Sequence, residues 1–318
     1  MSQPRGVYNL IASGGKINAK TLTDPNVDGI SIRDSWANVN PGPGMFNWSY
    51  LDSVVAIAKQ ANKKVLIRIS DGSINIPYWV MKKVKTTFTF DDPGSGNKVT
   101  IPVFWDPFYL QMKGELIAAF GKHYANHPLV TIASVGIANS NSDDWAIPHT
   151  PTDLANWAKV GYTSQKLIDA CTTIINAMMT AFTTQVMVAA TNPNGNLDAD
   201  PDTVRTAVVA AARSNWGNRL NVSQYNLSAM TFSPPPPPIG NFWRFWSQQS
   251  PVAAQMLWFT YGDGSYRNNG GTAGDFSTIL TAAVDIGKAY GSQFIEIYQT
   301  DCVNLPAVIA HAHSVLTS

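Results

Sequence analysis

Short apolar runs alternate along this chain with longer amphipathic stretches. The runs are almost continuously apolar or small, which is typical of strands covered on both faces of a parallel sheet. The longer stretches repeat apolar residues at i, i+3, i+4 and i+7, as in Leu51, Val54, Val55 and Ala58, and this spacing predicts helices. The predicted strands are residues 6–12, 27–33, 64–70, 131–138, 185–191, 220–229, 255–261 and 293–299.

Eight strands that alternate with helices predict an α/β fold, a single (β/α)8 TIM barrel over residues 1–318. Such a barrel needs about 250 residues and tolerates long loops. A doubly wound sheet is the alternative, but it requires a glycine-rich phosphate turn after its first strand. The segment at residues 13–16 (SGGK) matches that turn poorly, so the closed barrel is favoured.

Three insertions interrupt the repeating unit, at residues 81–104, 139–157 and 233–246. The first is expected to contain a hairpin of residues 85–90 and 98–104, and the third begins with five consecutive prolines. Asp153 is expected to cap a helix start, and Gly291 to follow a helix end. Each insertion follows a strand, so all three belong on the C-terminal face, where barrel enzymes carry their sites.

Composition narrows the functional classes. The net charge is +1 and only 14% of residues are charged, which argues against a nucleic-acid partner. No apolar run is long enough for a membrane helix. Cys171 and Cys302 are expected to be unpaired thiols, and the spacing of Cys and His gives no zinc motif. Few Lys and Glu with many Asn, Ser and Thr favour an extracellular location, although the first residues carry no apolar signal core.

Aromatic residues and glutamates point to a carbohydrate partner. Aromatics make up 11% of the chain, with ten tryptophans, and the only glutamates are Glu115 and Glu296. The apolar face of a sugar ring stacks on an indole or phenol ring. The aromatic residues predicted at or just past strand ends are Trp36, Trp79, Trp145, Trp258 and Tyr298. The sequence therefore predicts an aromatic sugar-binding cleft.

Residues 27–80 carry a more specific pattern. A strand ends in Arg33, Asp34 and Trp36 follow, and then come residues 44–52 (GMFNWSYLD), a helix, a third strand and residues 77–79 (PYW). This arrangement resembles the clan A glycoside hydrolases, especially the β-galactosidase-like families 42 and 35 and family 5. The resemblance implies cleavage of a β-linked glycan by two carboxylates, without a metal or cofactor. It also implies that Arg33 orients the nucleophile.

The rest of the chain departs from that pattern at both catalytic positions. The acid/base of these families follows an asparagine after strand four, but serine follows Asn139 and Asn141 here. The nearest carboxylates are Asp143 and Asp144, and an apolar wall such as Trp145 could raise the pKa of either carboxyl into the range of a general acid. The alternative is a solvated acidic loop.

The nucleophile should end strand seven, yet the strand glutamate, Glu296, lies on predicted strand eight. A buried glutamate needs a partner, so Glu296 is interpreted either as the nucleophile or as half of an ion pair with Arg33 or Arg68. Arg33 itself has the alternative of a structural salt bridge. Glu115 is assigned to the outside of a helix.

Further polar residues near strand ends are candidates to bind sugar hydroxyls. They are Asp34, Asn139, Asn141, His149, Gln299 and Asp301, with Asp71 and Asn192 as additional rim residues.

The leading hypothesis is a glycosidase with Glu296 as nucleophile and Asp143 or Asp144 as acid/base. Two rivals remain, a barrel that binds carbohydrate without cleaving it and a barrel enzyme of another class, such as a lyase. Carboxyl groups about 5–5.5 Å apart would indicate retention of configuration, and about 6.5–9.5 Å inversion.

Overall fold

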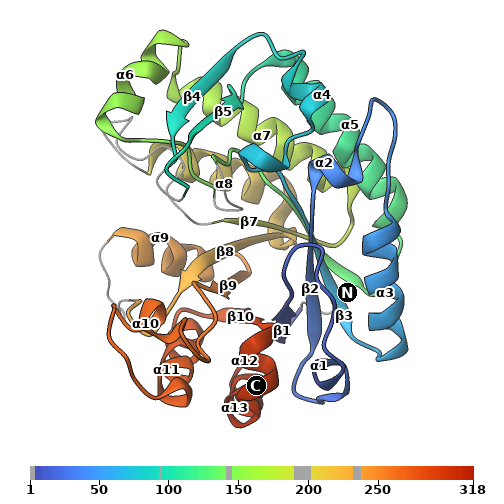
Figure 1. Cartoon of the computed structure of the whole chain (residues 1–318), viewed down its shortest axis with the longest axis vertical. Coiled ribbons are helices and arrows are strands. Elements are labelled where there is room, and N and C mark those ends of the chain that lie inside the picture. The colour runs from blue at the N-terminus through green and yellow to red at the C-terminus, as the bar shows by residue number, and fades with distance from the viewer. Residues whose placement is uncertain (1–3, 93–94, 141–144, 190–201, 232–237) are drawn as a thin grey trace.

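The computed structural model describes residues 4–92, 95–140, 145–189, 202–231 and 238–318. Eight parallel strands form a closed barrel in the order β1-β10-β9-β8-β7-β6-β3-β2, and β2 pairs with β1 to close it (Figure 1). The strands are β1 (Gly6–Leu10), β2 (Gly29–Ser35), β3 (Lys64–Ser70), β6 (Val130–Val135), β7 (Gln185–Ala189), β8 (Leu220–Leu227), β9 (Val252–Met256) and β10 (Ser292–Tyr298). The predicted TIM barrel is confirmed and the doubly wound alternative is excluded.

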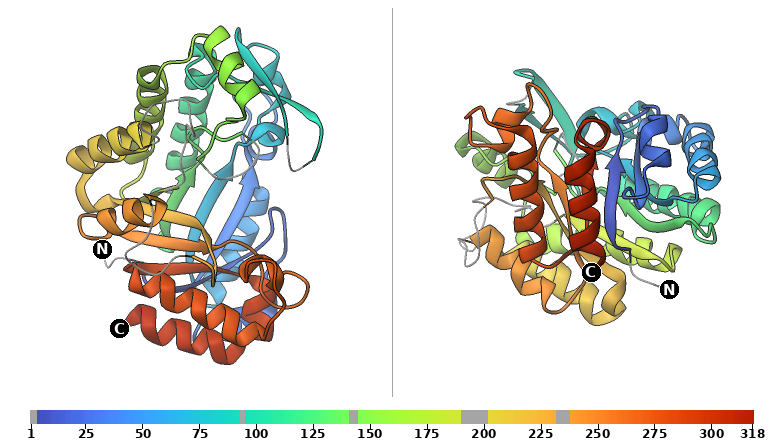
Figure 2. Two further views of the ribbon diagram at one scale, coloured as in Figure 1. Left: turned by 90° about the vertical axis from the view of Figure 1, so that its left-hand side faces the viewer. Right: turned by 90° about the horizontal axis from the view of Figure 1, so that it is seen from below.

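Helices cover the outside of the barrel because their apolar faces must be buried against the strands. In α3, the buried residues Leu51, Val54, Val55 and Ala58 are those of the predicted stripe. The longer helices are α3 (Ser49–Gln60), α5 (Pro107–Tyr124), α7 (Ser164–Ala181), α8 (Thr203–Trp216), α9 (Pro238–Ser247), α11 (Phe276–Ala289) and α13 (Pro306–Thr317). Figure 2 shows α11 and α13 side by side on one flank.

Shorter helices occupy the connections. They are α1 (Ala19–Thr23), α2 (Trp36–Val39), α4 (Tyr78–Met81), α6 (Pro151–Lys159), α10 (Ser265–Asn268) and α12 (Gln299–Asn304), with 3-10 turns at Ser73–Asn75 and Gly217–Arg219. None of the helices in the described ranges is both long and apolar enough to cross a membrane.

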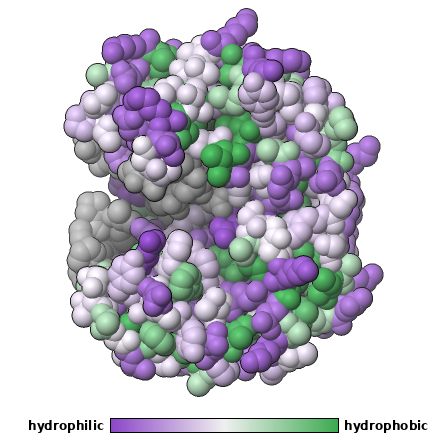
Figure 3. Space-filling model, in the orientation of Figure 1, coloured by the Kyte–Doolittle hydropathy of each residue, from purple (hydrophilic) through white to green (hydrophobic). Residues whose placement is uncertain are grey.

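The first insertion forms the predicted hairpin, β4 (Thr87–Asp91) paired antiparallel with β5 (Lys98–Pro102). Its buried Phe88 stacks on Trp157 of α6, with ring centroids 3.7 Å apart. The hairpin and α6 therefore pack together above the barrel. Figure 3 shows a hollow on the left of the molecule, between the region of α6 and that of α9.

One local expectation was wrong. Strand β9 is Val252–Met256, not residues 255–261, because the aromatic run that looked like strand lies in the loop after it. Asp153 caps the start of α6 as expected: it lies at the third helical position and closes a capping box with Thr150, the N-cap residue.

Other expectations hold. Gly291 follows the end of α11 with φ of +88°, a conformation that glycine adopts without strain. Cys171 and Cys302 are both buried and unpaired. Glu115 lies exposed on α5, where its carboxylate accepts a hydrogen bond from Gln111.

Candidate functional site

Glu296 lies inside the barrel, two residues before the end of β10, and its side chain is fully buried. Its Oε1 accepts a hydrogen bond from Arg68 Nη2 at 2.6 Å, and its Oε2 accepts one from Ser31 Oγ at 2.5 Å. A buried carboxylate is tolerated when a cation and hydrogen bonds replace the lost water. Both carboxylate oxygens of Glu296 are therefore engaged.

Arg68 connects this carboxylate to the rest of the barrel interior. Its Nη1 donates to Gln255 Oε1 at 2.8 Å, and its guanidinium carbon lies 4.5 Å from the centre of the Tyr225 ring. Gln255 is the register partner of Glu296 on the neighbouring strand β9. The result is a compact polar cluster held by β2, β3, β8, β9 and β10.

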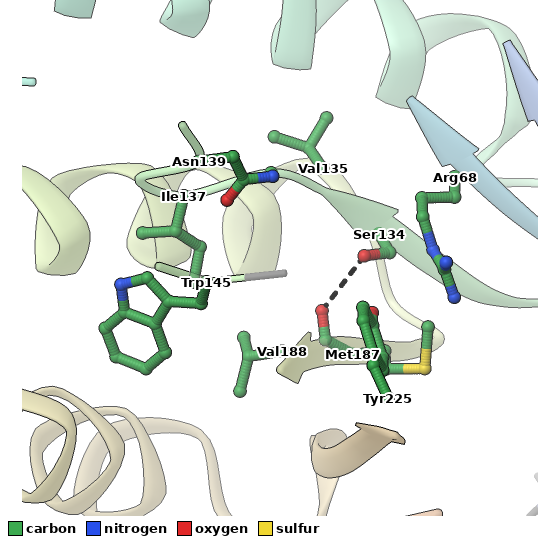
Figure 4. A pocket seen from close by; sticks show the side chains of 10 residues that line it. Arg68, Ser134, Val135, Ile137, Asn139, Trp145, Met187, Val188 and Tyr225 are labelled. Carbon is green, nitrogen blue, oxygen red and sulfur yellow. Dashed lines mark hydrogen bonds between the residues drawn. The ribbon is translucent and has the colours of Figure 1, made fainter. Parts of the chain in front are cut away.

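A small pocket lies beside this cluster, at the C-terminal ends of β6 and β7. In Figure 4, Arg68 and Tyr225 lie on one side of the pocket and Trp145 and Ile137 on the other. Ser134 Oγ donates to Met187 O at 3.2 Å within its wall. The volume of about 10 Å³ is close to the minimum that one water molecule requires. Arg68 thus contacts Glu296 and also lines the pocket.

Asp71, after β3, forms a second buried ion pair, with Lys113 of α5. It also accepts hydrogen bonds from Asn139 Nδ2 at 3.0 Å and Tyr109 OH at 3.3 Å. Burial lowers the pKa of the Lys113 ammonium. A Cβ at Gly136 would lie 1.5 Å from Asp71 Oδ1, so glycine is required there for this approach.

Asn139 joins that ion pair to the pocket. It is 1% exposed and lines the pocket, and its Oδ1 has no hydrogen-bond partner among the described residues. This side chain therefore offers an unpaired acceptor in the wall of the pocket.

Two rim candidates hold loops in place. Asp301, fully buried, accepts hydrogen bonds from the backbone N–H groups of Thr260 at 2.8 Å and Tyr261 at 2.6 Å. Burial raises the pKa of its carboxyl to about 6, against the lowering effect of those bonds. Gln299 accepts from Asn18 N at 2.8 Å and donates to Lys16 O at 3.1 Å. The loops after β9 and β1 are fixed in this way.

The five aromatic candidates divide into two groups. Trp36 and Trp145 are buried in the core at 0% and 1% exposure, so neither presents a face to solvent in this structure. Trp79, Trp258 and Tyr298 are half-buried. The rings of Trp258 and Tyr298 lie 6.1 Å apart, and the Arg267 guanidinium carbon lies 4.5 Å from the Trp258 ring centre. Trp258 and Tyr298 form a half-buried aromatic pair at this end of the barrel.

The remaining candidates lie apart from Glu296. Arg33 is half-buried on β2, in register with Arg68, but the ion pair with Glu296 is made by Arg68. Asp34 accepts hydrogen bonds from Ser35 N and Asn38 Nδ2, both at 2.8 Å. His149 is exposed, with its Nδ1 2.8 Å from Ile147 O. Asn141, Asp143, Asp144 and Asn192 lie outside the described residues.

Sequence reasoning missed Ser31, Gln255 and Tyr225. The period of two along a strand was the available signal, since Ser31 lies two residues before Arg33 and so on the same side of β2. Within the described ranges no group of three or more His, Cys, Asp or Glu side chains could hold a metal ion.

Comparisons with known proteins agree with this architecture. The family model of the family 42 glycoside hydrolases, described as beta-galactosidase, matches residues 18–173, slightly less than half of the chain. No curated protein sequence matches significantly.

Solved structures with the same fold are glycosidases at low sequence identity. The catalytic domain of a beta-amylase from Paenibacillus polymyxa is 14% identical, with a TM-score of 0.65 and 98% of each chain covered. Endo-glycoceramidase II from Rhodococcus sp. is 12% identical, with a TM-score of 0.54, covering 93% of this chain and 73% of the other.

A beta-galactosidase from Marinomonas ef1 is 10% identical, with a TM-score of 0.53, covering 92% of this chain and 53% of the other. These similarities establish the fold. Together with the family match they confirm the resemblance to clan A glycoside hydrolases and support a glycosidase.

Proposed function

We propose that this chain hydrolyses a β-linked glycan with two carboxylates, one of which is Glu296. The family pattern over residues 18–173 supports this proposal. The single observation that carries it furthest is the buried pair of Glu296 and Arg68, whose guanidinium also lines the pocket. Two carboxylates are the groups that glycoside hydrolysis requires, one to protonate the leaving oxygen and one to act on the sugar or on water.

Stability alone is a weak reason to keep such a pair. Replacing a buried ion pair by apolar residues of similar size is often neutral or stabilising. Glu296 is also one of only two glutamates in the chain. A charge-bearing cluster in the barrel interior, near the loop-bearing face, supports a chemical role for it.

We assign the acid/base role to Asp143 or Asp144. Both belong to the short segment between Ser140 and Trp145. The base of that segment is anchored, since Ser140 N donates to Ala146 O at 2.9 Å and Trp145 lines the pocket. The anchoring of the flanking residues beside the pocket supports the assignment of these two carboxylates over Asp34 and Asp301, which are already engaged in hydrogen bonds.

The test is a panel of chromogenic β-glycosides and β-linked oligosaccharides, with Glu296→Gln as the variant. Turnover should fall at least about 10³-fold, because an amide can neither attack the sugar nor activate water. Glu115→Gln is the matched control, since it makes the same chemical change on the exposed face of α5. Comparable turnover in Glu296→Gln and the parent would contradict the role of Glu296.

A second candidate is a barrel that binds a glycan without cleaving it. The complete burial of Glu296 and the size of the pocket favour it, since a sugar could not reach the carboxylate without movement of the wall. Calorimetric binding of an oligosaccharide by the parent, with no product released over the whole panel, would select this function and exclude hydrolysis.

A further inference from the structure

A second, larger pocket of about 850 Å³ lies at the opposite, N-terminal end of the barrel. Residues at the N-terminal ends of six strands line it, among them Arg5, Tyr8, Asp28, Lys64, Thr131, Gln185 and Arg219. Nothing in the two-carboxylate chemistry uses this end of the barrel. The proposed hydrolysis therefore does not explain this pocket.

The inner wall of the pocket includes a contact across the barrel. The Tyr8 hydroxyl on β1 lies 3.3 Å from Thr131 Oγ1 on β6, so the side chain of Tyr8 crosses the lumen. A Cβ at residue 29 would lie 2.4 Å from the Tyr8 ring, so Gly29 leaves the space that this ring occupies. The lining of the pocket thus includes two strands, β1 and β6, that are not neighbours in the barrel.

Positive charge predominates around this pocket. Arg5, Lys64 and Arg219 line it, and Arg5 Nη1 donates to Ser318 O at 3.3 Å. Among the described lining residues the one carboxylate is Asp28, which is already bound by Val7 N at 2.8 Å and His313 Nδ1 at 2.9 Å. Arg219 donates to the carbonyl oxygens of Met179 and Phe182, which fixes its guanidinium without neutralising the charge. In the described part of the chain, Lys64 forms no ion pair.

Two buried donors of the wall lack partners within the described residues. Gln185 is 7% exposed and its Nε2 has no acceptor, while its Oε1 is held by Asn221 Nδ2 at 3.4 Å. Thr184, 8% exposed, has no partner for its Oγ1. A buried donor without an acceptor is costly, and an oxygen of a ligand would remove that cost.

We infer that the N-terminal mouth of the barrel binds a small oxyanion, the phosphate or carboxylate group of a ligand distinct from the glycan. Lys64 and Arg219 supply its positive field, and Gln185 Nε2 and Thr184 Oγ1 are unpaired donors in the same wall. Charge-assisted hydrogen bonds of this kind are stronger than neutral ones. The site lies on the face of the barrel opposite the proposed glycan site, so oxyanion binding can be tested independently of hydrolysis.

The experiment is isothermal titration calorimetry of the parent with inorganic phosphate and, in a second arm, with malonate, in buffer free of other polyvalent anions. One site is expected, and the tighter of the two probes identifies the preferred oxyanion. Lys64→Gln should weaken binding about tenfold. Gln185→Met, which keeps the side-chain length and removes the donor, should weaken it about fivefold.

Lys98→Gln is the control, because it removes the same charge from an exposed pair with Asp91 on the hairpin. It should bind the oxyanion as the parent does. The inference is overturned if neither probe binds by about 10 mM, if Lys64→Gln and Gln185→Met bind as tightly as the parent, or if Lys98→Gln weakens binding equally. Glycan turnover of Lys64→Gln should equal that of the parent.

Discussion

Glu296 and Asp301 are both fully buried carboxylates, five residues apart on β10 and the helix α12 that follows it. Glu296 is bound by side chains, an arginine and a serine from other strands. Asp301 is bound by backbone N–H groups of one loop. Glu296 therefore belongs to a charged cluster of side chains inside the barrel, whereas Asp301 fixes the path of the chain.

Removing one partner from the Glu296 cluster should cause the largest loss of stability. Arg68→Met leaves Glu296 buried with its cation removed, which should cost about 3–5 kcal/mol of the free energy of unfolding. Urea unfolding of the parent and variant measures this difference. Lys98→Met, in an ion pair whose two side chains are each 74% exposed, should change stability by less than about 1 kcal/mol.

The double variant Arg68→Met with Glu296→Leu tests whether the lost stability comes from the unpaired charge. Removal of both charges should recover most of the lost stability, because no uncompensated charge remains. Recovered stability without glycan turnover would show that the pair serves chemistry rather than folding. Equal stability of Arg68→Met and Lys98→Met would contradict the burial of the Glu296–Arg68 pair.

Asp301 should make the stability of the protein depend on pH. Its pKa is about 6 in the folded protein against 3.8 for the free side chain, so the folded state binds the proton more tightly. Stability from this group is therefore greatest below about pH 4 and falls as pH rises to about 6, by about 3 kcal/mol in total.

Asp301→Asn removes that titration. Urea unfolding from pH 4 to pH 7 should show the parent losing stability relative to this variant as pH rises, and no further relative change above pH 7. Parallel curves for parent and variant would contradict the raised pKa. The same comparison with Asp34→Asn controls for a carboxylate whose hydrogen bonds come from residues one and four positions further along the chain.

The smallest expected losses of stability come from removing single hydroxyl groups. Ser31→Ala removes a hydrogen bond to the Glu296 carboxylate and should cost about 2 kcal/mol. Ser134→Ala removes one to the neutral carbonyl of Met187 and should cost about 1 kcal/mol. Equal costs, measured by urea unfolding, would indicate that Glu296 carries no more charge than a carbonyl oxygen.

The sequence by itself determined much of this protein. Continuous apolar runs specified seven of the eight barrel strands closely, because a strand buried on both faces leaves a local signal. Strand β9 was displaced, since its alanines resemble a weak strand and the aromatic residues after it a strong one. The scarcity of glutamate singled out Glu296 before any contact was known.

The tertiary structure decided which residues meet. Arg33 and Arg68 occupy matching positions on adjacent strands, and only the closed barrel shows that Arg68 reaches Glu296. Gln299 and Asp301 follow the end of strand β10, where a sugar-binding residue would be expected, yet they bind loops that are far away in the sequence. Periodicity is a local property of the chain, whereas partners across a barrel depend on how all eight strands close.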